Sequence, residues 1–109
     1  MRRATVTGDA RLDLLLARYR DEFWGGAPEA IEVEGICTAY AHELAEFLRE
    51  HGEDAEVHYV EHPFELGYTD RTRIPAEDEG HAVVRVGLYL IDFTAAQYGY
   101  GEFPLVTRA

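Results

Sequence analysis

The sequence predicts a single α+β domain over residues 1–109, in which two helices pack on a small antiparallel sheet. The chain has 109 residues, of which 47% are hydrophobic, and this supplies one compact core but not two. Two segments in the first half carry apolar residues at helical spacing. Three shorter segments in the second half are rich in branched and aromatic residues. Helices followed by strands are typical of the α+β class.

The two helices are predicted in the first half of the chain. Asp9 is placed to cap the first helix, which ends near Trp24. A second helix is predicted from Cys37 to His51, with Gly52 as its C-terminal cap. The apolar stripe of the first helix comprises Leu12, Leu15, Leu16, Tyr19 and Phe23. The apolar face of the second comprises Tyr40, Ala41, Leu44, Ala45, Phe47 and Leu48.

The strands are predicted in the second half. Residues 55–60 alternate as a strand does, and residues 81–87 and 88–93 form a tight hairpin around a glycine. Residues 61–80 contain prolines, glycines and many charges, which predicts a long surface loop. Residues 94–106 offer a short turn or helix and a last extended piece that can extend the sheet. The predicted core comprises Leu12, Leu15, Leu16, Tyr19, Leu44, Phe47, Leu48, Val57, Val84, Val86, Leu90 and Ile91.

The charge balance restricts the partners. Asp and Glu number 21 against 10 arginines, so the formal net charge is −11. Such a chain repels nucleic-acid phosphates and anionic lipid, and we expect a basic partner in place of a nucleic acid or a membrane. The sequence contains no Ser, Asn or Lys, which excludes a serine nucleophile and a lysine Schiff base.

The single cysteine indicates a reducing compartment. Cys37 has no cysteine to pair with, and one thiol with scattered histidines is no zinc pattern, so we predict neither a disulfide nor a metal nor a cofactor. His58 and His62 lie on one face of a predicted strand but about 13 Å apart, too far for one metal ion. The start of the chain lacks the apolar block of a signal peptide, so the expected location is the cytoplasm, with delivery by another route left open.

Three residues form a candidate catalytic set. Cys37 begins the second helix, where unpaired N–H groups and the helix dipole favour a thiolate. His81 and Asp92 lie on the two arms of the hairpin, so a near-opposite register places an imidazole beside a carboxylate on one face. A thiol, a base and a group that orients the base are the parts of a nucleophilic triad.

The segments GICTAYAHELAEFLREHG, GHAVVRV and LIDFT, within residues 35–98, resemble the papain-like superfamily, most closely its small transglutaminase-like members. The resemblance implies a minimal papain-like core that performs acyl transfer on amides. Cys37 would be the nucleophile, His81 the general base and acid, and Asp92 the orienting group. Papain uses a glutamine as an oxyanion donor, and the only glutamine in this chain is Gln97. Gln97 and Trp24, the only tryptophan, are the candidates for oxyanion or substrate contacts.

Other interpretations of these residues stay open. Cys37 shares the apolar face of its helix, so it can be a buried packing residue. His81 can be an ordinary residue at the start of a strand. Asp92 can cap the turn that follows it, with help from Thr94. Glu29, Glu32 and Glu34 oppose a thiolate at Cys37 if they lie close to it.

The functional alternatives are an enzyme and two kinds of non-catalytic protein. As an enzyme, the chain is a thiol hydrolase or acyltransferase of effector or toxin type on a protein or peptide, by deamidation, proteolysis or transglutamination. The alternatives are a non-catalytic acidic protein that occludes a basic surface, as an inhibitor does, and a degenerate papain-like scaffold. The sequence predicts no oligomeric state.

Overall fold

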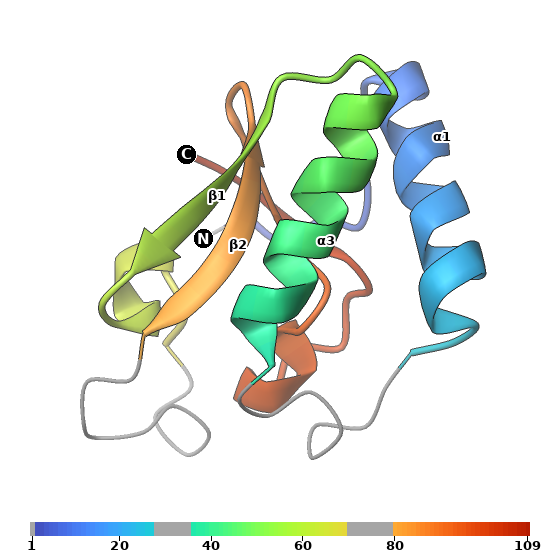
Figure 1. Cartoon of the computed structure of the whole chain (residues 1–109). Helices are drawn as coiled ribbons and strands as arrows, with labels where there is room; N and C mark the ends of the chain where they lie inside the picture. The colour runs from blue at the N-terminus through green and yellow to red at the C-terminus, as the bar shows by residue number, and fades with distance from the viewer. Residues whose placement is uncertain (1, 28–35, 70–79) are drawn as a thin grey trace.

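The computed structural model describes residues 2–27, 36–69 and 80–109. Within them, two α-helices cover one face of a four-stranded antiparallel sheet, as Figure 1 shows. This confirms the predicted α+β class. The elements are α1 (Ala10–Tyr19), α3 (Cys37–Glu50), β1 (Ala55–Val60), β2 (His81–Val86), β3 (Tyr89–Asp92) and β4 (Leu105–Arg108). The fourth strand comes from the segment predicted as a last extended piece.

The first helix begins as predicted. The Asp9 carboxylate accepts a hydrogen bond of 3.0 Å from the Leu12 N–H and so caps α1. The helix continues into a π-helical turn, η1 (Arg20–Trp24). Phe23, predicted in the apolar stripe, is 49% exposed, because the wider π turn does not continue the α-helical spacing. Its ring stacks on Tyr19 at the rim of the core, with centroids 5.0 Å apart.

The second helix begins at Cys37 and ends one residue earlier than predicted. Gly52 follows with φ +88°, a left-handed conformation that glycine adopts without strain. The Glu53 N–H then donates a 2.9 Å hydrogen bond to the Leu48 carbonyl, which closes the helix end. The buried residues of α3 are Cys37, Ala41, Leu44, Ala45, Phe47 and Leu48.

The strands lie in the order β1-β2-β3-β4. One row of paired residues, Val57, Val84, Ile91 and Val106, runs across all four strands. Beyond β4, the N–H of Ala4 donates to the Val106 carbonyl at 3.1 Å, and the Val106 N–H donates back at 2.8 Å. The two chain ends are therefore close together (Figure 1).

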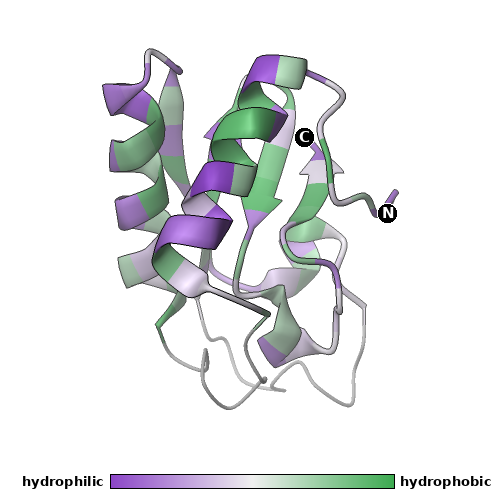
Figure 2. Ribbon diagram, turned by 90° about the vertical axis from the view of Figure 1, so that its right-hand side faces the viewer, coloured by the Kyte–Doolittle hydropathy of each residue, from purple (hydrophilic) through white to green (hydrophobic). Residues whose placement is uncertain are grey.

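The sheet buries apolar residues on both faces. The helix-side cluster joins α1 and α3 to Val84, Val86 and Ile91, and all predicted core positions are buried except Val57, which is partly buried against that cluster. Figure 2 shows hydrophilic colour on the helix surfaces that face away from the sheet. Both described α-helices are too short to cross a membrane, the longer having 14 residues.

A second cluster covers the opposite face and corrects one prediction. The expected surface loop over 61–80 contains a 3₁₀ turn, η2 (Pro63–Leu66), and Pro63, Leu66 and Tyr68 are buried. The ring centroid of Tyr68 lies 5.9 Å from that of Tyr98 and 4.9 Å from that of Tyr100. The residues around Tyr68 in the sequence do not predict these contacts. The rest of the expected loop, 70–79, lies outside the described residues.

Candidate active site

His81 and Asp92 meet at one end of the hairpin. His81 is the first residue of β2 and Asp92 the last of β3. Strands β2 and β3 pair Val84 with Ile91, and one further step places Asp92 opposite Val83, on the face that His81 also occupies. The two side chains are thus diagonal neighbours, and Nε2 of His81 lies 2.7 Å from Oδ2 of Asp92. The predicted proximity of the imidazole and the carboxylate is confirmed.

Asp92 is buried and accepts four hydrogen bonds. Oδ2 accepts from His81 Nε2 and from the Tyr68 hydroxyl, both at 2.7 Å. Oδ1 accepts from the Thr94 N–H at 2.8 Å and from the Thr94 hydroxyl at 3.1 Å. Burial raises the pKa of Asp92, but His81, Tyr68 and Thr94 together hold it below its usual value of 3.8. Asp92 therefore both supports the turn after β3 and orients His81, two roles that the sequence left as alternatives.

His81 is fully buried and strongly polarised. Burial lowers its pKa, but the Asp92 carboxylate outweighs burial and raises the pKa of His81 to about 9. Because a carboxylate only accepts hydrogen bonds, Nε2 carries the proton in this pair. The ring is also fixed edge-on against Tyr98, with centroids 4.9 Å apart. Nδ1, the other ring nitrogen, is buried and has no conventional hydrogen-bond partner among the described residues.

Cys37 supplies the thiol at the first residue of α3. Its helix begins without a side-chain cap at Ile36, so the N–H groups of the first turn remain available to a negative charge. Burial raises the pKa of the Cys37 thiol, but the His81 imidazole and then the Ala82 N–H outweigh burial, and the net pKa is below its usual value of 9.0. Cys37 and His81 therefore stabilise each other's charged forms.

The three side chains are closely enclosed. Cys37 is 7% exposed, His81 0% and Asp92 3%. A cavity of about 10 Å³ lies between α3 and the sheet beside Cys37, which is room for about one water molecule. It is a packing gap between helix and sheet, too small to accept a substrate.

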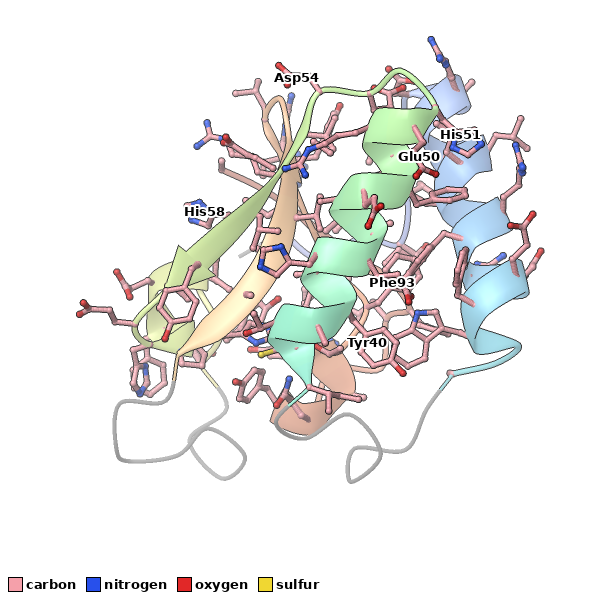
Figure 3. All side chains as sticks on the ribbon, in the orientation of Figure 1. Tyr40, Glu50, His51, Asp54, His58 and Phe93 are labelled. Carbon is pink, nitrogen blue, oxygen red and sulfur yellow. The ribbon has the colours of Figure 1, made fainter. Side chains whose placement is uncertain are left out.

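The two further candidates, Trp24 and Gln97, contact residues that neighbour the site. Trp24 stacks on Tyr40, with centroids 4.2 Å apart, and lies parallel to Phe93 at 6.4 Å. Tyr40 and Phe93 are labelled in Figure 3. The Gln97 amide donates to the Thr94 hydroxyl at 3.2 Å. Neither Trp24 nor Gln97 is among the described residues that line the cavity beside Cys37. Gln97 is linked to Asp92 through Thr94, and Trp24 packs against Tyr40, which lines that cavity together with Cys37. Their roles as oxyanion or substrate contacts stay predictions.

Three contacts to the site were not predicted from the sequence. Tyr68 donates to Asp92, Tyr98 fixes the imidazole ring, and the Ala82 N–H faces the thiol. Only the Ala82 contact had a local signal, because Ala82 directly follows His81. Tyr68 lies in a segment dominated by turn residues and charges, and its burial depends on Tyr98 and Tyr100, which lie some thirty positions later.

The remaining sequence features lie elsewhere. The N–H of Phe64 donates to His62 Nδ1 at 3.1 Å, so His62 caps η2. Among the described residues, no group of three His, Cys, Asp or Glu side chains could hold a metal ion. The three carboxylates expected to oppose the thiolate, at 29, 32 and 34, lie outside the described residues.

Comparison with known proteins adds no relative. No protein-family model matches the chain, and no curated protein or solved structure matches it significantly.

Proposed function

We propose that the protein is a cysteine-dependent acyl-transfer enzyme that acts on amide bonds of a protein or peptide, with a papain-like, transglutaminase-like triad of Cys37, His81 and Asp92. The observation that carries the proposal is the 2.7 Å contact between His81 Nε2 and Asp92 Oδ2. That contact fixes the imidazole and leaves Nδ1 to exchange a proton with the thiol of Cys37.

The first half of the reaction forms a thioester. Nδ1 of His81 takes the thiol proton, and the Cys37 thiolate attacks the amide carbon while the carbonyl electrons move to oxygen. His81 Nδ1–H then protonates the amide nitrogen, the C–N bond breaks and the amine leaves. The backbone N–H of Cys37, at the start of α3, is one donor to the oxyanion.

The second half releases the acyl group. Neutral His81 takes a proton from water through Nδ1, the oxygen of that water attacks the thioester carbon, and the C–S bond breaks to restore the thiolate. Asp92 stays ionised throughout and stabilises the imidazolium each time it forms. When the first leaving group is ammonia the reaction is deamidation, and when it is a peptide amine the reaction is proteolysis. An amine in place of water gives transglutamination.

A second candidate function is a non-catalytic acidic protein that occludes a basic surface. The observation that favours it is the exposed face of α3, where Glu43, Glu46 and Glu50 follow one another at helical spacing in a chain of net charge −11. Such a protein would bind a basic partner in a salt-sensitive way, and Cys37→Ala would bind as well as the parent.

Trapping the acyl-enzyme tests the enzymatic proposal. The parent and Cys37→Ala are incubated with a defined mixture of synthetic peptides that contains backbone amides and glutamine and asparagine carboxamides, with hydroxylamine as acceptor. We expect peptide hydroxamates, detected by mass, from the parent only. Equal amounts from the Cys37→Ala protein, or none from either, would contradict the proposal.

A further inference from the structure

A second cavity, of about 240 Å³, adjoins the candidate site. Its walls include the rings of Phe93, Tyr100 and Phe103, the carboxylate-bearing Glu102 and small residues between them, and we call it the aromatic pocket. Phe93 also lines the small cavity that Cys37 lines. The aromatic pocket and the thiol are therefore neighbours across one aromatic side chain.

The aromatic pocket has the size of a single long side chain. Its volume is below the range of cavities that enclose a whole drug-sized ligand. Phe93 and Phe103 pack edge to face, with centroids 5.1 Å apart and planes at 85°, and Trp24 packs edge-on against Phe103 at 5.4 Å. These contacts hold the walls in place, so the aromatic pocket exists before any ligand enters.

Two residues that line the aromatic pocket, Tyr100 and Glu102, already bind a cation. The guanidinium of Arg3 forms a two-pronged ion pair with the Glu102 carboxylate. The same guanidinium lies over the Tyr100 ring, 4.8 Å from its centroid. The hydrogen bond from Arg3 holds the pKa of Glu102 below its usual value, so the carboxylate is ionised. Arg3 is about half exposed, and its side chain can therefore make way for another cation.

We propose that the aromatic pocket receives a lysine or arginine side chain of the amide substrate. The aliphatic stem would pack against Phe93 and Phe103, and the cationic head would bind Tyr100 and Glu102. The proposal rests on the proposed function, since it assigns a substrate preference to the Cys37 site. The net charge of −11 acts in the same direction, because it favours the approach of basic peptides.

Matched electrophiles test the preference without a known substrate. The N-chloroacetyl amides of lysine amide and norleucine amide carry the same four-carbon stem and differ in the terminal ammonium group. Alkylation rates of Cys37 by each are compared, with iodoacetamide as the reference reagent that lacks a side chain. We expect the lysine reagent to react about fivefold faster than the norleucine reagent at low salt, with a smaller ratio at high salt.

Two variants of the same ion pair distinguish recognition from a loosened structure. Glu102→Gln and Arg3→Gln both remove the ion pair between these residues. Glu102→Gln removes the carboxylate that would bind the substrate cation, whereas Arg3→Gln removes the guanidinium that competes with that cation. We expect the lysine-to-norleucine ratio to fall toward one in Glu102→Gln and to rise in Arg3→Gln. Glu56→Gln, on the exposed edge of β1, measures the effect of one charge elsewhere and should leave the ratio nearly unchanged.

The outcomes separate this proposal from the one it rests on. A thiol that iodoacetamide modifies in a His81-dependent way, but with equal rates for the two reagents, would overturn the aromatic pocket alone. The aromatic pocket alone would also be overturned if Glu56→Gln lowered the lysine-to-norleucine ratio as much as Glu102→Gln. A ratio that shifted in the same direction in Glu102→Gln and Arg3→Gln would overturn it too. A thiol inert to iodoacetamide in the folded protein would overturn both proposals.

Discussion

The Tyr68 hydroxyl donates a 2.7 Å hydrogen bond to Oδ2 of Asp92, the same oxygen that His81 contacts. Tyr68 is 2% exposed and lies two residues after the 3₁₀ turn η2, in the segment between β1 and β2. A tyrosine in this place connects the turn segment to the hairpin that carries the site. Its hydroxyl is one of the donors that keep Asp92 ionised.

Tyr68→Phe should therefore destabilise the protein and make it more sensitive to acid. Loss of a buried hydrogen bond to a charged group costs about 1.5–3 kcal/mol of unfolding free energy. The pKa of Asp92, which lies below 3.8, rises when a donor to its carboxylate is lost. Stability from Asp92 is present at higher pH and lost as pH falls through its folded pKa, so acid unfolding should begin at a higher pH in the variant.

Urea unfolding at neutral pH and an acid titration followed by circular dichroism measure both effects. Tyr89→Phe is the matched control, since the Tyr89 hydroxyl makes no hydrogen bond with described residues and Tyr89 is only partly buried. Equal behaviour of the two variants would show that the Tyr68–Asp92 contact does not support the site.

The candidate catalytic set could be predicted from the sequence because each member begins or ends a regular element. Cys37 starts a helix with a clear apolar face, and His81 and Asp92 flank a hairpin whose glycine fixes the turn. Their proximity then follows from antiparallel pairing. Trp24 and Gln97 stay candidates, because the sequence does not place them relative to the thiol. Tyr68 could not be predicted, because its described contacts with Asp92, Tyr98 and Tyr100 join residues far apart along the chain.

The protonation of His81 should make stability depend on pH. The pKa of His81 is about 9 in the folded protein, against an ordinary value of 6.5. Because folding raises the pKa of His81, the protonated imidazole stabilises the folded protein. This stability is complete below pH 6.5 and is lost as pH rises toward 9. The full shift corresponds to roughly 3 kcal/mol. When both the Asp92 carboxylate and the Cys37 thiol are removed, burial alone acts on His81 and lowers its pKa, so stability should no longer fall over this range.

Urea unfolding at several pH values between 6.5 and 9 tests this prediction. It is best made in the Cys37→Ala background, since the thiol and the imidazole shift each other's pKa and only the imidazole remains in that variant. Unfolding free energies that stay flat in Cys37→Ala, or that fall equally with Asp92→Asn added, would show that Asp92 does not hold the proton on His81.

The cap of α1 should affect stability without affecting the site. Asp9→Ala removes the 3.0 Å hydrogen bond to the Leu12 N–H and should cost about 1 kcal/mol of unfolding free energy. Asp21→Ala, in the exposed η1 turn, should cost less than about 0.5 kcal/mol. Chemical denaturation measures both, and we expect unchanged alkylation of Cys37 in both folded variants. Slower alkylation in Asp9→Ala would mean that α1 helps to position the thiol.

The pH dependence of Cys37 alkylation by iodoacetamide, followed by intact mass, tests the Cys37–His81 pair most directly. The parent is compared with His81→Ala and with His42→Ala, which removes an exposed histidine from the same helix as Cys37. We expect the parent and His42→Ala to react rapidly well below the pKa of about 8.5 of a free thiol, and His81→Ala to lose that reactivity. A thiol that is inert in the folded parent, or that reacts equally with and without His81, would contradict the proposed chemistry and leave Cys37 as a packing residue.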